Sequence, residues 1–175
     1  MYTLEDIRRY CKERGKKKVM VDTNLLLLFL VGSCDINFLS SCESTSKYSK
    51  NDHQLLLGML RYFDSEIVIT PHVLAEFSNL SRRDIKEPRL SYYLATVLDA
   101  LKRHKEEHVP LEIILKSKIN VLSSYGFTDI SITEAALKIN AVILTDDIGL
   151  GLYADSKNIA NIKFAAAKAD MLISR

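Results

Sequence analysis

The chain has 175 residues, of which 47% are hydrophobic and 26% are charged, with a net charge of +2. This composition is typical of one soluble globular domain, and it argues against intrinsic disorder and against a strongly basic nucleic-acid-binding protein. The longest apolar run, at 25–31, is too short to cross a bilayer, and the charged N-terminus does not resemble a signal peptide, so we expect a cytoplasmic protein without membrane contact.

The first 51 residues predict a helix, a strand, a second helix and a loop. An amphipathic helix is expected at 3–15, with Thr3 as its N-cap and Gly15 at its end. A short strand at 18–22 leads into an apolar helix at 24–31. Residues 32–51 are rich in Ser, Cys, Asn and Lys and are expected to form a loop or insertion.

The remaining segments alternate between strands and helices. We expect strands at 66–70, 141–144 and 159–164, and helices at 52–63, 71–81, 89–106, 112–124, 129–138 and 147–155. This alternation predicts a single α/β domain over 1–175, a three-layer α/β/α sandwich with a central, mostly parallel sheet of about four to five strands.

Four acidic residues fall near the expected carboxyl ends of strands. They are Asp22, Glu76, Asp129 and Asp147. Parallel α/β sheets bind ligands at this edge, and carboxylates gathered there repel one another unless a cation lies between them. Mg²⁺ or Mn²⁺ is the expected cation because both prefer oxygen ligands. Singly, three of these acids have a plainer interpretation: Asp22 as a turn residue, Asp129 as a helix cap and Glu76 as a solvent-facing residue.

Other candidate features are weaker. The three cysteines, Cys11, Cys34 and Cys42, lack the spacing of a zinc site, and we expect free thiols. Basic clusters at 8–9, 16–18, 82–83 and 102–105 are typical of solvated surfaces, although beside an acidic site such cations can hold the phosphates of a polyanion. No residue is singled out for RNA contact.

Four segments together resemble the motifs of the PIN-domain nucleases. VMVDTNLLL resembles the first strand of that family, which ends in Asp, and TPHVLAEFSNL resembles the helix that carries a Glu. GFTDISITEAAL resembles the third motif, and AVILTDDIGL resembles the fourth, in which a strand ends in Thr-x-Asp. The motifs follow the family order and cover residues 19 to 150.

The resemblance implies a metal-dependent ribonuclease. It assigns metal binding and catalysis to Asp22, Glu76, Asp129 and Asp147, with Mg²⁺ or Mn²⁺ as cofactor and RNA as substrate. It further implies hydrolysis to 5′-phosphate and 3′-hydroxyl products. Asn24 and Thr145 match supporting polar positions of the family. Asp146 remains open between an exposed turn residue and an outer ligand.

Several biological roles are consistent with this resemblance. The preferred one is the toxin of a toxin–antitoxin pair, of the VapC type, with a small antitoxin as partner and a homodimer as the assembly. An RNA-processing or phage-defence nuclease is the main alternative, and a non-catalytic PIN-like module that binds protein or RNA is another. A haloacid-dehalogenase-type phosphatase is disfavoured because Asn24 stands where that signature requires a second Asp, and a response-regulator receiver because the acid pair comes late in the chain.

Overall fold

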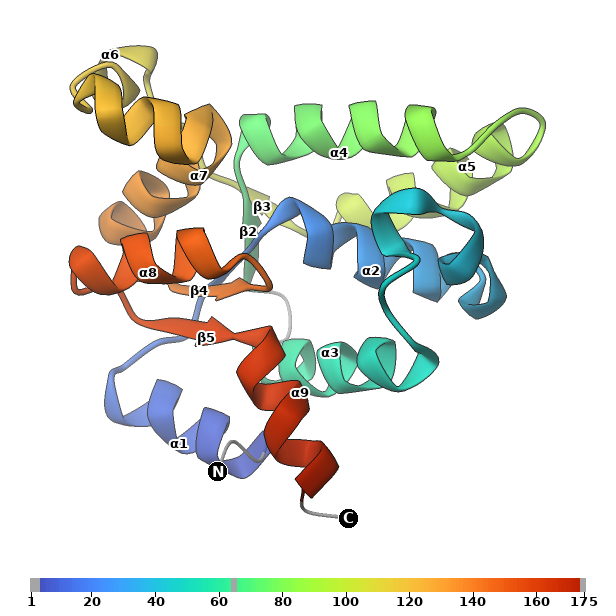
Figure 1. The fold of residues 1–175 in the computed structure, drawn as a ribbon, viewed down its shortest axis with the longest axis horizontal. Coiled ribbons are helices and arrows are strands. Elements are labelled where there is room, and N and C mark those ends of the chain that lie inside the picture. Colours follow the sequence, from blue (N-terminus) through green and yellow to red (C-terminus); the bar gives the residue numbers. More distant parts are fainter. Residues whose placement is uncertain (1–3, 64–65, 174–175) are drawn as a thin grey trace.

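Five parallel strands form one sheet at the centre of the computed structural model, which describes residues 4–63 and 66–173 (Figure 1). The strands lie in the order β3-β2-β1-β4-β5. Their bounds are β1 (Val19–Val21), β2 (Ile67–Ile69), β3 (Lys105–Glu106), β4 (Val142–Thr145) and β5 (Asn161–Lys163). The predicted α/β class is therefore confirmed, and all of the strand pairs are parallel.

The core of the protein forms around β1, the central strand of the sheet. Met20 pairs with Val68 of β2 on one side and with Ile143 of β4 on the other. Every residue of β1, β2 and β4 is buried, as expected for parallel strands that are covered on both faces. Such strands consist of continuous apolar runs, which is the pattern of VMV in β1, IVI in β2 and the first three residues of β4, VIL.

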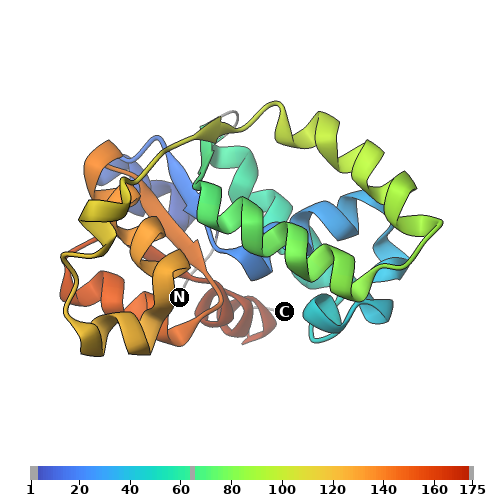
Figure 2. The ribbon, with the colours of Figure 1, turned by 90° about the horizontal axis from the view of Figure 1, so that it is seen from above.

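Helices cover both faces of the sheet. They are α1 (Leu4–Glu13), α2 (Thr23–Cys34), α3 (Lys50–Phe63), α4 (Pro71–Asp84), α5 (Arg89–Leu101), α6 (Leu111–Ile114), α7 (Ile119–Ile139), α8 (Ile148–Ser156) and α9 (Phe164–Ile173). In Figure 1, α1, α3 and α9 lie below the strands, whereas α4 and α7 lie above them. Figure 2 shows α4 and α5 extending away from the sheet as a pair, and the rings of Phe77 and Tyr93 join them at 6.4 Å. None of the helices within the described ranges combines the length and apolar character needed to cross a membrane.

The N-terminal part of the chain largely follows its prediction. Helix α1 ends at Glu13, and Gly15 then adopts a positive φ of 61° while its N–H donates to the Lys12 carbonyl at 3.1 Å. A left-handed glycine is a common way to end a helix. Thr3, the expected N-cap, lies outside the described residues.

Residues 32–51, expected to form a loop or insertion, contain more helix than the prediction allows. Helix α2 continues to Cys34, two short 3₁₀ helices follow at Ile36–Ser41 and Glu43–Thr45, and α3 begins at Lys50. Leu39, Cys42 and Tyr48 are buried and anchor this segment to the core.

The predicted bounds of three other elements are wrong. The helix expected at 89–106 ends at Leu101, and the chain then forms the unpredicted strand β3, where Glu107 N donates to Ile69 O at 3.0 Å. The helix expected at 112–124 is divided into α6 and the start of α7. The last strand is shorter than expected because Phe164 already begins α9, which was not predicted.

Candidate functional site

Asp22 follows the last residue of β1 and caps helix α2. Its backbone is extended, and its Oδ1 accepts a hydrogen bond of 2.7 Å from Leu25 N. Aspartate is a favoured N-cap because its carboxylate accepts from one of the free N–H groups of the first turn and faces the positive end of the helix dipole. The change from strand to helix therefore fixes this side chain, which is only 4% exposed.

The other carboxylate oxygen of Asp22 is held by the end of β4. Oδ2 accepts hydrogen bonds from the hydroxyl of Thr145 and, at 2.8 Å, from the N–H of Asp146. Burial raises the pKa of Asp22 above its ordinary value, and these hydrogen bonds oppose that shift only in part. The carboxyl ends of β1 and β4 are thus joined through one carboxylate, to which Thr145, a predicted supporting residue, donates its hydroxyl proton.

Glu76 comes from α4, which begins directly after β2. Thr70 caps this helix, accepting from Val73 N at 3.3 Å, and Pro71 is its first residue, as predicted. Glu76 Oε2 accepts a hydrogen bond of 2.8 Å from the hydroxyl of Thr23, the first residue of α2. Thr23 is buried and was not predicted as a site residue. It connects Glu76 to the element that Asp22 caps.

Asn24, the other predicted supporting residue, contributes less. It is half-buried in the first turn of α2. Its side-chain amide makes no hydrogen bond to another of the residues that the structure describes, so the polar contact to Glu76 comes from its neighbour Thr23 instead.

Asp129 lies in the part of α7 that follows a backbone break. Gly126 has φ 72° and ψ 179° inside this helix, and helical geometry resumes at Phe127. Asp129 therefore lies within the first turn, and the prediction that it begins the helix is wrong. No described residue donates a hydrogen bond to its carboxylate, whereas its backbone carbonyl accepts from Thr133 Oγ1 at 2.7 Å.

A pair of buried hydroxyls holds this part of α7 against α4. Ser131 Oγ donates to Thr128 O at 2.7 Å and lies 2.9 Å from Thr70 Oγ1. Since the Ser131 proton is used by Thr128, the Thr70 hydroxyl donates to Ser131. The N-cap of α4 and the helix that carries Asp129 are thereby joined at the carboxyl end of β2.

Asp147 caps α8 just beyond β4. Its Oδ1 accepts from Leu150 N at 3.0 Å, and its own N–H donates to Thr145 Oγ1 at 2.9 Å. The residue is exposed, and Oδ2 accepts no hydrogen bond from the described residues. Asp147 thus combines a structural hydrogen bond with an oxygen open to solvent.

The electrostatics connect these four acids. Burial raises the pKa of Asp129 to about 7, and the negative charges of Asp147, Asp22 and Glu76 add to the shift in that order. The three other carboxylates belong to three different elements. The charges of the three other predicted acids therefore reach Asp129 at the carboxyl edge of the sheet.

Asp146 faces a different set of partners from Asp147. Its Oδ2 accepts from Lys47 Nζ and from the Tyr48 hydroxyl, each at 2.8 Å, and its side chain is 13% exposed. Burial and the hydrogen bond to Asp146 raise the pKa of Tyr48, so its hydroxyl remains protonated and donates. The Asp146 side chain is therefore not a free turn residue, and its charge contributes to the raised pKa of Asp22. Its backbone N–H, in contrast, binds Asp22.

The carboxylate oxygens at this edge fit a hydrated divalent cation better than a cation without bound water. Within residues 4–63 and 66–173, no group of three or more His, Cys, Asp or Glu side chains is close enough to form a ready metal cluster. Mg²⁺, however, usually keeps several waters and takes only one or two carboxylates directly. A set of carboxylate oxygens that repel one another has the charge and the ligand type that such an ion requires.

Thiol ligands are not part of this arrangement. Cys11, Cys34 and Cys42 are free, as predicted, and burial raises the pKa of Cys11 and Cys42 to about 11.

Comparison with known proteins adds no functional assignment: no protein-family model matches the sequence, and no curated protein matches it at a significant level.

Proposed function

We propose that the protein is a metal-dependent endoribonuclease of the cytoplasm, in which Asp22, Glu76, Asp129 and Asp147 hold Mg²⁺ or Mn²⁺. One observation carries the proposal: the negative charges of Asp147, Asp22 and Glu76, which belong to three other elements, act on the half-buried Asp129 carboxylate at the carboxyl edge of a parallel sheet. A fold gains no stability from gathering like charges at such an edge. A divalent cation would remove their repulsion and keep all four ionised.

The carboxylates divide into oriented and available oxygens. Both oxygens of Asp22 accept hydrogen bonds from the protein, so this side chain is rigid. Oε2 of Glu76 and Oδ1 of Asp147 are held in the same way. The other oxygens of Glu76 and Asp147, together with the Asp129 carboxylate, accept no hydrogen bond from the described residues. These oxygens are the ones that a hydrated cation would bind.

A cation bound here would lower the pKa of a water molecule and offset the charge that develops on a phosphodiester. The residues supply orientation and proton transfer. Without a cation, burial and the neighbouring acids raise the pKa of Asp129 to about 7, and a bound cation would favour its ionised form.

RNA as the substrate rests on the motif resemblance, as do the biological roles. The toxin role requires a small antitoxin that suppresses cleavage and homodimerisation of the nuclease. An RNA-processing or phage-defence nuclease requires no inhibitor. Co-expression with the small open reading frames beside its gene separates these roles, because only a toxin is silenced by one of them.

The test is cleavage of matched RNA and DNA oligonucleotides with Mg²⁺, with Mn²⁺ and with EDTA. We expect RNA to be cut only when a divalent cation is present, and we expect Asp22→Asn and Asp129→Asn to abolish cutting. Asp99→Asn is the matched control, because Asp99 is exposed and pairs with Lys102 far from these acids in the chain. Cleavage that survives EDTA or both substitutions would contradict the proposal.

A further inference from the structure

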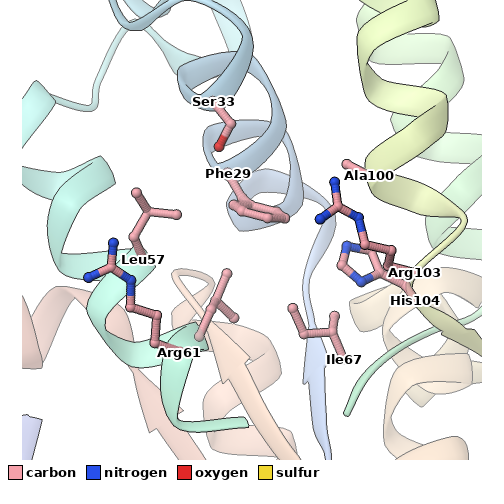
Figure 3. A pocket seen from close by; sticks show the side chains of 9 residues that line it. Phe29, Ser33, Leu57, Arg61, Ile67, Ala100, Arg103 and His104 are labelled. Atoms are coloured by element: carbon pink, nitrogen blue, oxygen red, sulfur yellow. The ribbon is translucent and has the colours of Figure 1, made fainter. Parts of the chain in front are cut away.

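A second concave site lies among α2, α3, β2 and the end of α5 (Figure 3). Its volume is about 460 Å³, which is within the range of about 300–1,000 Å³ that small-molecule sites occupy. Ile67, the first residue of β2, forms part of its wall, whereas the candidate acids follow the last residues of the strands. The cavity is therefore at the other end of β2 from the proposed nuclease site.

Helical spacing explains the composition of its walls. Phe29 and Ser33 lie one turn apart on α2, and Leu57 and Arg61 lie one turn apart on α3, so each pair faces the same way. The apolar part of the wall consists of Phe29, Leu57, Leu60, Ile67 and Ala100. Figure 3 shows the Phe29 ring pointing into the space between the two sides.

The polar part of the wall is positively charged. Arg61 and Arg103 stand on opposite sides of the cavity in Figure 3, and no acidic residue of the described chain lines it. Neither arginine forms an ion pair with any residue in 4–63 or 66–173. Within the described residues, the guanidinium groups make one hydrogen bond, a long one from Arg103 Nε to the Asp99 carbonyl at 3.4 Å. Two guanidinium groups therefore keep most of their donors for another partner.

His104 adds an unsatisfied polar group to the same wall. A turn after α5 places it there, since His104 N donates to Leu101 O at 3.0 Å. Its ring lies 6.0 Å from the Phe29 ring, and neither of its ring nitrogens has a hydrogen-bond partner among the described residues, although both are buried. Buried polar atoms without partners are uncommon in native proteins and often mark a place where another molecule binds.

We propose that this cavity binds a small organic anion, in which a carboxylate or phosphate is joined to a flat apolar body. The apolar wall and the Phe29 ring receive the body. The exposed guanidinium groups of Arg61 and Arg103, one on each side of the cavity, offer their donors to the anionic head, because guanidinium groups form paired hydrogen bonds with carboxylate and phosphate oxygens. Among the described residues that line the cavity, the charged ones are all positive, and this selects an anion over a neutral or cationic ligand of the same shape.

The test uses 2-naphthoate and 2-naphthyl phosphate as anionic probes and 2-naphthalenemethanol as a neutral probe of similar shape. Each is titrated into the full chain in EDTA, and the methyl signals of Leu57, Ile67 and Ala100 are followed by NMR. We expect at least one anion to shift these signals saturably with one site per chain, and the neutral probe to bind about tenfold more weakly. The preferred anion identifies the head group, and EDTA makes the result independent of nuclease activity.

Substitutions locate the binding. Arg61→Gln and Arg103→Gln should each weaken the anion by about tenfold, whereas Arg82→Gln, an exposed arginine on α4, should not. Both lining arginines are exposed, so the fold tolerates their loss. Ala100→Leu fills the cavity and should block all three probes. The proposal fails if neither anion gives a saturable shift, if the neutral probe binds equally well, or if both Gln variants bind as the native protein does.

Discussion

The backbone N–H of Asp146 donates a hydrogen bond of 2.8 Å to Oδ2 of Asp22. These residues follow neighbouring strands, and the Asp146 carboxylate is in turn bound by Lys47 and Tyr48. The segment between α2 and α3 is thus linked through Asp146 to Asp22, the most buried acid of the candidate site. Asp146 contributes its backbone to the site and its side chain to the support of that backbone.

Tyr48→Phe tests this support. The change removes the hydroxyl that binds Asp146 but keeps the ring, whose edge-to-face contact with Phe164 has a centroid distance of 6.2 Å. We expect the free energy of unfolding to fall by about 1 kcal/mol and RNA cleavage to fall by about tenfold or more, as when a ligand-orienting partner is lost. Denaturant unfolding and cleavage assays measure the two effects. Tyr92→Phe is the control because Tyr92 is 69% exposed, and equal effects of the two variants would contradict this role.

The principal parts of the fold and of the acid site could be predicted from local patterns. Asp22 and Asp147 each end an apolar run and begin a helix, and both the strand and the cap are encoded in adjacent residues. Helix α4 was recognisable because Pro71 follows an apolar strand. Such features need only a few neighbouring residues to be read.

The partners of the acids could not be predicted in this way. Tyr48 and Asp146 are 98 residues apart, and Thr23 and Glu76 are 53 residues apart, so no spacing rule joins them. Strand β3 consists of two exposed charged residues, so its sequence has no alternation of apolar and polar side chains. Only its pairing with β2 identifies it as a strand. Tertiary contacts override local propensity at all of these positions.

Thr23→Val should remove the hydrogen bond that orients the Glu76 carboxylate. The substitution keeps the shape of the side chain but removes the hydroxyl that donates to Glu76 Oε2 at 2.8 Å. We expect a loss of stability of about 1–2 kcal/mol, because the hydrogen bond goes to a charged acceptor, and weaker binding of Mn²⁺ by calorimetry. Thr23→Ser restores the hydroxyl and should restore the Mn²⁺ affinity. If the Ser and Val variants bind Mn²⁺ alike, the hydroxyl does not orient Glu76.

Gly126→Ala should strain the start of the helix that carries Asp129. The backbone angles of Gly126 lie in a region that only glycine adopts readily, while a Cβ there would meet no atom within 4 Å. The cost is therefore backbone strain without a steric clash, and we expect about 1–3 kcal/mol of lost stability. Thermal unfolding checks this, with Ser123→Ala in the same helix as the control. A variant as stable as the native protein would mean that the break tolerates a side chain.

The stability of the metal-free protein should decrease as the pH rises toward neutrality. Burial and neighbouring charges raise the pKa of Asp129 from 3.8 to about 7, so the folded state binds a proton more tightly than the unfolded state does. The stability that this proton provides is fully present below pH 3.8 and is lost as the pH rises through about 7.

Asp129→Asn removes this titration. At pH 8 in EDTA, we expect the variant to be more stable than the native protein by on the order of 1–2 kcal/mol, because an amide carries no charge to be repelled. Excess Mg²⁺ should reverse the order, since a cation favours the ionised native carboxylate and the amide is a weaker ligand. Glu107→Gln, which removes an acid that is paired with Lys138 instead, controls for a general effect of charge. A native protein whose stability in EDTA does not change between pH 5 and pH 8 would show that the pKa of Asp129 is not raised by burial and the neighbouring acids, and the proposed metal site would lose its main support.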